Sequence, residues 1–66
     1  MEYLITTVKE NDIKIISRHE TLEEAMEAGE KIWNEVPKGV SVSCISGTLD
    51  EEGRLKGQYL LYNCWF

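Results

Sequence analysis

The side chains that could act as nucleophiles, bases or soft metal ligands are few in this 66-residue chain. They are one histidine, His19, and two cysteines, Cys44 and Cys64. Nucleophilic catalysis needs a base placed on its nucleophile, and no spacing here indicates such a pair. A zinc site needs four grouped ligands, and the chain has no Cys-x-x-Cys. We therefore predict a protein that is not an enzyme, with no catalytic, metal-binding or cofactor-binding residues.

The same three residues have simpler structural interpretations. His19 precedes the start of a predicted helix and is expected to be a surface or hinge residue. Cys44 lies within an apolar strand pattern, where a free thiol behaves as a small hydrophobe. Met1 and Glu2 lead into no basic-then-apolar leader, and no apolar run approaches the ~18 residues that span a bilayer. We expect a cytoplasmic location, reduced cysteines and no membrane partner.

Carboxylates dominate the charge, with 12 acidic against 7 basic residues and a net charge of -5. The basic residues are scattered, which argues against direct nucleic-acid binding, because phosphate contacts need grouped Lys and Arg. The acidic residues form two groups, and these make a possible docking surface: Glu23, Glu27, Glu30, Asp50, Glu51 and Glu52. A solvated surface explains them, and so does a surface that imitates phosphates or docks on a basic partner.

The first of the elements that must position these residues is a hairpin. Residues 2–10 and 13–18 are rich in β-branched and aromatic side chains, which is typical of strands. Asn11 and Asp12 supply turn chemistry between them and predict a two-residue loop.

A helix follows the hairpin. Thr21 and Glu24 have the spacing of a capping box, and the apolar residues from Leu22 to Val36 recur at steps of three and four. Gly29 lies on that apolar stripe and is expected to allow close approach to the sheet. Pro37 and Gly39 end the helix.

Residues 40–49 and 54–66 form the closing hairpin around the acidic turn. If Asp50 faces Gly53, one predicted face points at the helix and carries Val40, Val42, Cys44, Leu55, Tyr59, Leu61 and Trp65. The other carries Ser41, Ser43, Ile45, Lys56, Gln58, Leu60, Tyr62, Cys64 and Phe66, so the two cysteines do not bridge. A bulge at Gly57 would exchange the faces of the later residues.

The predicted fold is therefore a single α+β domain over residues 1–66. Its order is ββαββ, with a four-stranded antiparallel sheet and one amphipathic helix packed on one face. Trp65 is expected to reach the helix near Trp33 or Val36. The open face leaves a possible interface at Ile45, Leu60, Tyr62 and Phe66, where apolar area suggests a partner.

The helix segment "TLEEAMEAGEKIWNEV", with the flanking "IISRHE" and "SGTLDEEG", resembles a group of short uncharacterised bacterial proteins. That resemblance covers most of the chain, implies a bacterial origin and carries over no activity. The apolar open face and the acidic charge lead to two hypotheses of function. The first is a small protein-interaction module that forms a homodimer through the open sheet face or the last strand. The second is an acidic inhibitor or phosphate mimic, of a phage or mobile-element type, acting on a nucleic-acid enzyme.

Overall fold

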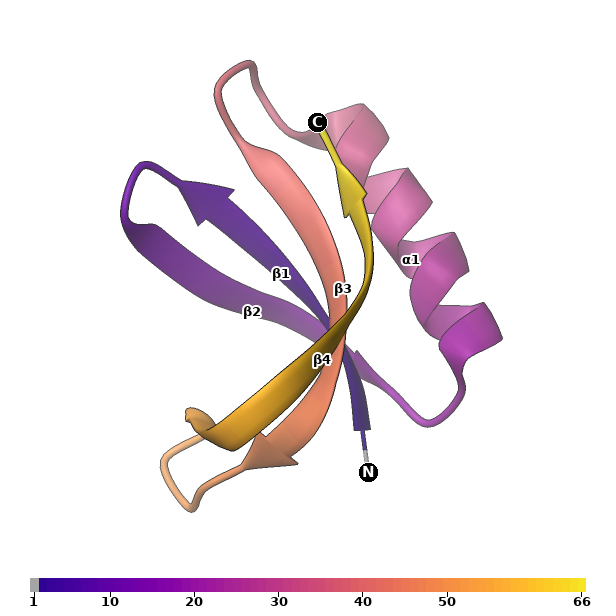
Figure 1. The fold of residues 1–66 in the computed structure, drawn as a ribbon. Coiled ribbons are helices and arrows are strands. Elements are labelled where there is room, and N and C mark those ends of the chain that lie inside the picture. The colour runs from indigo at the N-terminus through magenta and orange to yellow at the C-terminus, as the bar shows by residue number, and fades with distance from the viewer. Residues whose placement is uncertain (1) are drawn as a thin grey trace.

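Four strands and one helix follow one another in the order ββαββ in the computed structural model, which describes residues 2–66. They are β1 (Glu2–Lys9), β2 (Asp12–His19), α1 (Leu22–Glu35), β3 (Ser41–Leu49) and β4 (Leu55–Trp65). All neighbouring strands are antiparallel, and their spatial order is β2-β1-β3-β4. The helix lies on one face of this single sheet (Figure 1), so the predicted α+β class is confirmed.

The helix begins and ends where its sequence signals place it. Thr21 is the N-cap, and its Oγ1 accepts a hydrogen bond from the Glu24 N–H at 3.2 Å. Val36 adopts an extended conformation as the C-cap, and Pro37 follows it. The predicted apolar stripe faces the sheet, with Ala25 and Gly29 buried along its centre.

The core between helix and sheet is small and well defined. Four residues form its fully buried centre: Ile5 on β1, Ala25 on α1, and Val42 and Cys44 on β3. Partly buried apolar residues surround them: Tyr3, Leu22, Met26, Ala28, Ile32, Trp33, Val36 and Trp65. Burying one large apolar side chain contributes about 1.5–3 kcal/mol, so a few such residues decide whether a chain of this length folds.

The first hairpin differs from its prediction by one residue. Lys9 pairs with Asp12, so the two-residue loop is Glu10–Asn11 and not Asn11–Asp12. Glu10 takes the left-handed conformation, at φ 57°, that the sequence favours for Asn11. Farther from the loop, an irregularity between Ile5 and Thr6 shifts the register of the β1–β2 pair by one residue.

The closing hairpin shows the larger departure from prediction. Asp50 pairs its backbone N–H with the Arg54 carbonyl at 2.8 Å, so Asp50 faces Arg54 and not Gly53. Two further irregularities follow, one opposite Gly47 and one between Cys44 and Ile45. The first inserts two extra residues into β4 and the second inserts one, so by the end of the strand Val42 pairs with Trp65, where the sequence predicts a pairing with Leu61.

The one-residue shift at the Asp50–Arg54 loop exchanges the faces of Leu55, Leu60 and Leu61, because side chains alternate along a strand, and the later insertion near Tyr62 restores the predicted faces of Cys64 and Trp65. Leu55, Tyr59 and Leu61 lie with Ile45 on the open face, so their predicted orientation toward the helix is wrong. Leu60 pairs with Ser46 and Tyr62 bonds to it, which places both on the helix side, so their predicted open-face position is wrong. Trp65 faces the helix, as predicted.

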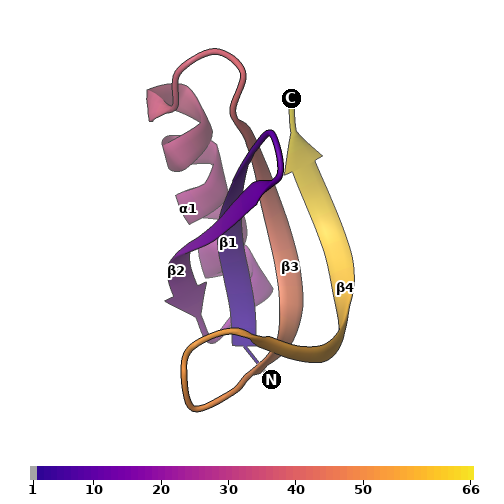
Figure 2. The same ribbon diagram turned by 90° about the vertical axis from the view of Figure 1, so that its left-hand side faces the viewer.

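The sheet is strongly twisted (Figure 2), and both hairpins bend away from the helix (Figure 1). This curvature brings the start of β2 toward the loop after β3. Ile13 and Ile15 from β2 therefore line one hollow together with Gly53, Arg54 and Leu55. The open face is a concave trough with apolar walls.

Candidate functional site on the last strand

The three residues with nucleophilic or basic side chains do not come together. His19 lies at the end of β2, with Nε2 2.8 Å from the hydroxyl of Ser17. Cys44 is fully buried under the helix, and burial raises the pKa of its thiol. Cys64 lies on the other face with its Sγ 3.6 Å from the Ser43 hydroxyl, and both cysteines are free. The prediction that they do not bridge is confirmed.

Metal and membrane sites receive no support from the part of the chain that the structure describes. Residues 2–66 contain no group of three or more His, Cys, Asp or Glu side chains placed to hold a metal ion. Within the same residues, no helix has the length and apolarity that crossing a bilayer requires.

The most unusual surface belongs to β4, which is an edge strand of eleven residues. Large apolar side chains are exposed along its second half and just after it: Tyr59, Leu60, Leu61, Tyr62 and Phe66. Every residue from Gly57 to Phe66 lacks a charged side chain. Exposed apolar side chains on an uncharged edge are the features that native proteins usually avoid unless the edge has a partner.

The predicted interface is therefore distributed over β4 and its neighbours instead of forming one patch. Ile45 is 4% exposed and belongs to the floor of the open trough. Leu60, at 61% exposed, lies on the helix side. Tyr62 is held there by two contacts: its hydroxyl accepts from Ser46 Oγ at 3.3 Å, and its ring packs on Tyr3 with centroids 5.6 Å apart.

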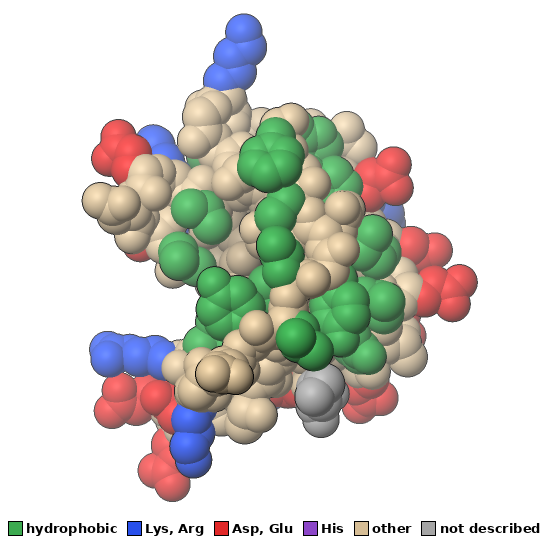
Figure 3. Space-filling model, viewed as in Figure 1, with side chains coloured by type: hydrophobic (Ala, Val, Ile, Leu, Met, Phe, Trp, Pro, Cys, Tyr) green, Lys and Arg blue, Asp and Glu red, His purple; other side chains and the backbone are tan. Residues whose placement is uncertain are grey.

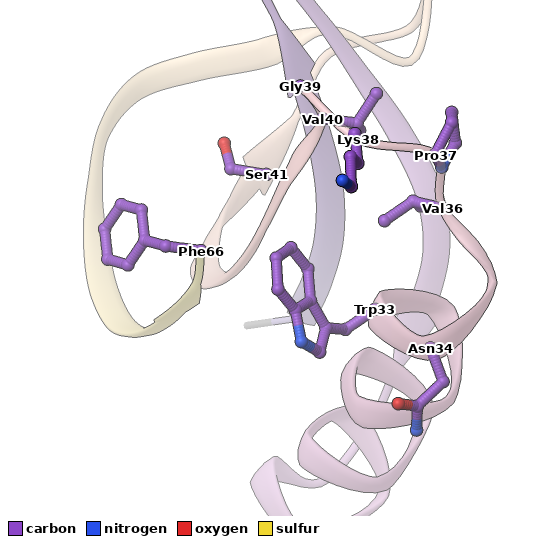
Figure 4. Close-up of a pocket in the computed structure, with 9 residues that line it drawn as sticks. All are labelled: Trp33, Asn34, Val36, Pro37, Lys38, Gly39, Val40, Ser41 and Phe66. Atoms are coloured by element: carbon purple, nitrogen blue, oxygen red, sulfur yellow. The ribbon is translucent and has the colours of Figure 1, made fainter.

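Phe66 lies apart from the other three, beyond the end of β4, and is 91% exposed. It borders a shallow hollow at the end of the helix, where the ring of Trp33 points into the space between α1 and β3 (Figure 4). The Phe66 ring points away from Trp33 in this view. Phe66 thus adds apolar area at the end of the β4 edge.

The open face holds a small cavity of about 170 Å³ inside the curved sheet. Side chains of all four strands line it, in order Thr6, Val8, Ile13, Ser43, Ile45, Leu55, Tyr59, Leu61 and Cys64. The sequence-based register missed this group because it assigned Tyr59 and Leu61 to the helix side. The shift arises in the loop, where Asp50 faces Arg54, before β4 begins, so Gly57, which takes φ 75° at the first insertion, does not indicate it.

A shallow groove of about 700 Å³ lies on the other face, between α1 and β4. Leu22, Met26 and Trp65 form its apolar part, and Glu23, Glu27 and Glu30 form its acidic part. In Figure 3 the apolar side chains between the last strand and the helix are bordered by carboxylates on the helix. The helical acidic group is thus placed beside an apolar surface.

The second acidic group, Asp50, Glu51 and Glu52, includes two residues that bond within their own loop. The Asp50 carboxylate accepts hydrogen bonds from the backbone N–H groups of Glu52 and Arg54, both at 2.9 Å. Glu52 lies 3.8 Å from the Arg54 guanidinium. Figure 1 places this loop and the helix at opposite sides of the molecule, so the two acidic groups do not form one surface.

Comparisons with protein-family models, with curated proteins and with solved structures gave no match. The resemblance to short bacterial proteins therefore stays a prediction.

Proposed function

We propose that this protein is a small non-enzymatic interaction module that forms a homodimer by pairing the outer edge of β4 with the β4 of a second copy. The observation that carries the proposal is the uncharged, apolar edge from Gly57 to Phe66. An edge strand presents unpaired N–H and C=O groups that can template another strand. A two-fold pairing would join two four-stranded sheets into one of eight strands.

The other edge of the sheet gives an internal comparison. β2 carries Asp12, Lys14 and Arg18 among eight residues, whereas β4 carries Lys56 alone among eleven. Charged side chains on an edge discourage strand addition, because pairing would desolvate them. This contrast supports β4, and not β2, as the self-association edge.

Small size supports the same proposal. A chain of about 60 residues buries only ~60% of the surface its unfolded form exposes, and oligomerisation often supplies the rest. Pairing at β4 would cover Leu60 on one sheet face and Leu61 on the other, since both are more than half exposed beside the edge.

Sedimentation equilibrium at micromolar concentration tests the dimer. We expect twice the 7.6 kDa mass of the chain for the wild type. Leu60→Lys and Leu61→Lys should each shift the protein to monomer, because a lysine ammonium opposes burial at the interface between the two β4 strands. Ile16→Lys is the matched control, since Ile16 is 48% exposed on β2 and should leave the dimer intact.

Amide hydrogen exchange separates edge pairing from packing of the two open faces. Edge pairing protects outward-directed amides within Tyr59–Cys64 in a concentration-dependent way, because those N–H groups gain carbonyl partners. Face-to-face packing leaves these amides unchanged and makes Leu61→Lys disruptive while Leu60→Lys is silent. A monomer at all concentrations, or that second pattern, would contradict the edge-paired dimer.

The acidic-inhibitor hypothesis has weaker support. Asp50 and Glu52 are engaged within their own loop, and the helical carboxylates lie on a separate side. A mimic of a nucleic-acid backbone needs a continuous row of charge. The arrangement favours docking of the helical carboxylates on a small basic surface. The hypothesis of a phosphate mimic is tested by measuring whether the protein competes with DNA for a basic nucleic-acid enzyme.

A further inference from the structure

We propose that the groove between α1 and β4 binds a basic amphipathic helix of a partner protein. The groove combines an apolar part, Leu22, Met26 and Trp65, with one row of carboxylates, Glu23, Glu27 and Glu30. This site lies on the helix face of the sheet and shares only Trp65 with the strand edge proposed above for self-association, so substitutions in the carboxylate row test it separately.

The charge of the row is available to a partner. The ion pairs within residues 2–66 use Glu2, Asp12 and Glu52, and none of them uses a carboxylate of the groove. Lys31, four residues after Glu27, makes no ion pair there either, although the spacing permits one. The row therefore presents three negative charges to a cationic ligand.

The spacing of the row selects a helix over an extended strand. Glu23, Glu27 and Glu30 are four and three residues apart, so along the axis of α1 they are separated by about 6 Å and about 4.5 Å. Lysines at positions i, i+4 and i+7 of a second helix have the same separations. Side chains on one face of an extended strand are about 6.6 Å apart and lose this match after one step.

The apolar part gives the second half of the recognition. Leu22 and Met26 are one helical turn apart on α1, and Trp65 flanks them from β4. All three are partly buried and leave apolar atoms at the surface. A helix whose apolar stripe adjoins its lysines would place Leu or Met side chains on them, as helix-in-groove complexes do, and Met26 adapts readily to such contacts.

The probe for this site is an 18-residue designed helix with lysines at i, i+4 and i+7 beside a leucine stripe. Two control peptides accompany it: one replaces the lysines with glutamates, and one keeps the composition but alternates lysine and leucine in a strand pattern. Calorimetry should detect binding of the first peptide and about a tenfold or larger loss of affinity for each control.

Protein variants locate the binding. A triple change, E23Q, E27Q and E30Q, should weaken binding at least about tenfold, since it removes the whole row. The matched triple, E10Q, E20Q and E51Q, removes the same charge from exposed positions elsewhere and should keep the affinity within about twofold. Equal losses in both triples would show attraction to net charge alone and would overturn the proposal.

NMR gives a readout that does not depend on the charge variants. The Trp65 indole N–H signal and the amides of Leu22–Glu30 should shift on titration, while those of the β2 edge stay in place. Shifts confined to β2 or to the β3–β4 loop would overturn the site. A dimer that survives E23Q, E27Q and E30Q while peptide binding is lost would separate this site from the β4 edge.

Discussion

The indole ring of Trp65 lies against Gly29, in the space that a side chain at position 29 would fill. A Cβ built on Gly29 would lie 2.7 Å from Cζ3 of the ring, which is closer than van der Waals contact permits. The predicted contact of Trp65 with the helix is thereby confirmed, and the helix residue that it contacts is Gly29. The backbone of Trp65 also pairs with Val42 on β3. Strand pairing and the contact of the Trp65 ring with Gly29 together fix the position of β4 relative to the helix.

Gly29→Ala should destabilise the protein by about 1–2 kcal/mol, although alanine is the better helix former by about 1 kcal/mol. The added methyl forces the Trp65 ring to move, and this overpacking exceeds the gain in helix propensity. Urea unfolding measures the difference. The same change in a Trp65→Phe background should cost less, because the smaller ring leaves room. A stabilised Gly29→Ala single variant would show that the ring shifts freely.

Glu10→Gly should stabilise the protein by about 0.5–1 kcal/mol. Glu10 holds φ 57° in the β1–β2 loop, a conformation that costs an L-residue about 1–2 kcal/mol and glycine little, while glycine loses more entropy on folding. Thermal unfolding detects this as a higher Tm. Lys9→Gly, one residue earlier within β1, should instead lower Tm, since glycine weakens a strand.

Asp50→Ala should destabilise the closing hairpin by about 1–2 kcal/mol. The Asp50 carboxylate accepts from two backbone N–H groups, those of Glu52 and Arg54, and alanine leaves both to solvent. Glu51→Ala, in the same loop, should change the free energy of unfolding by less than about 0.5 kcal/mol. Similar costs for the two variants would mean that loss of charge, and not loss of these hydrogen bonds, sets the effect.

Stability should fall at alkaline pH because of Cys44. Burial raises the pKa of this thiol in the folded state above its ordinary value of 9.0, so the folded protein binds the proton more tightly than the unfolded chain. The contribution is complete below pH 9.0 and is lost as the pH rises toward the folded-state pKa. Urea unfolding between pH 8 and pH 10 should show this slope, and Cys44→Ala should reduce it.

Helix α1 could be predicted from the sequence because its signals are local. The Thr21 cap, the apolar stripe and Pro37 all act within a few residues of where they stand. The faces of β4 could not be predicted in the same way. They depend on the Asp50–Arg54 loop and on two insertions that only pairing with β3 reveals, and each one-residue slip reverses the face of every later side chain.

The candidate site was accessible from the sequence only in part. Leu60, Tyr62 and Phe66 are exposed, but Leu60 and Tyr62 lie on the helix side and not on the predicted open face, and Ile45 of the same predicted set is buried. The edge position of β4 depends on strand order, which no local signal encodes. The groove likewise required the placement of Trp65 beside Glu23, Glu27 and Glu30.

The insertion opposite Cys44 and Ile45 has a consequence for which strands β4 can accept. It bends the outer edge near Tyr62, so a flat and regular strand can follow the edge on one side of that point and then loses register. Indiscriminate strand addition, the first step of fibre growth, is thereby interrupted after a few residues. An uncharged edge can thus remain open to a partner of matching shape while it resists unlimited stacking.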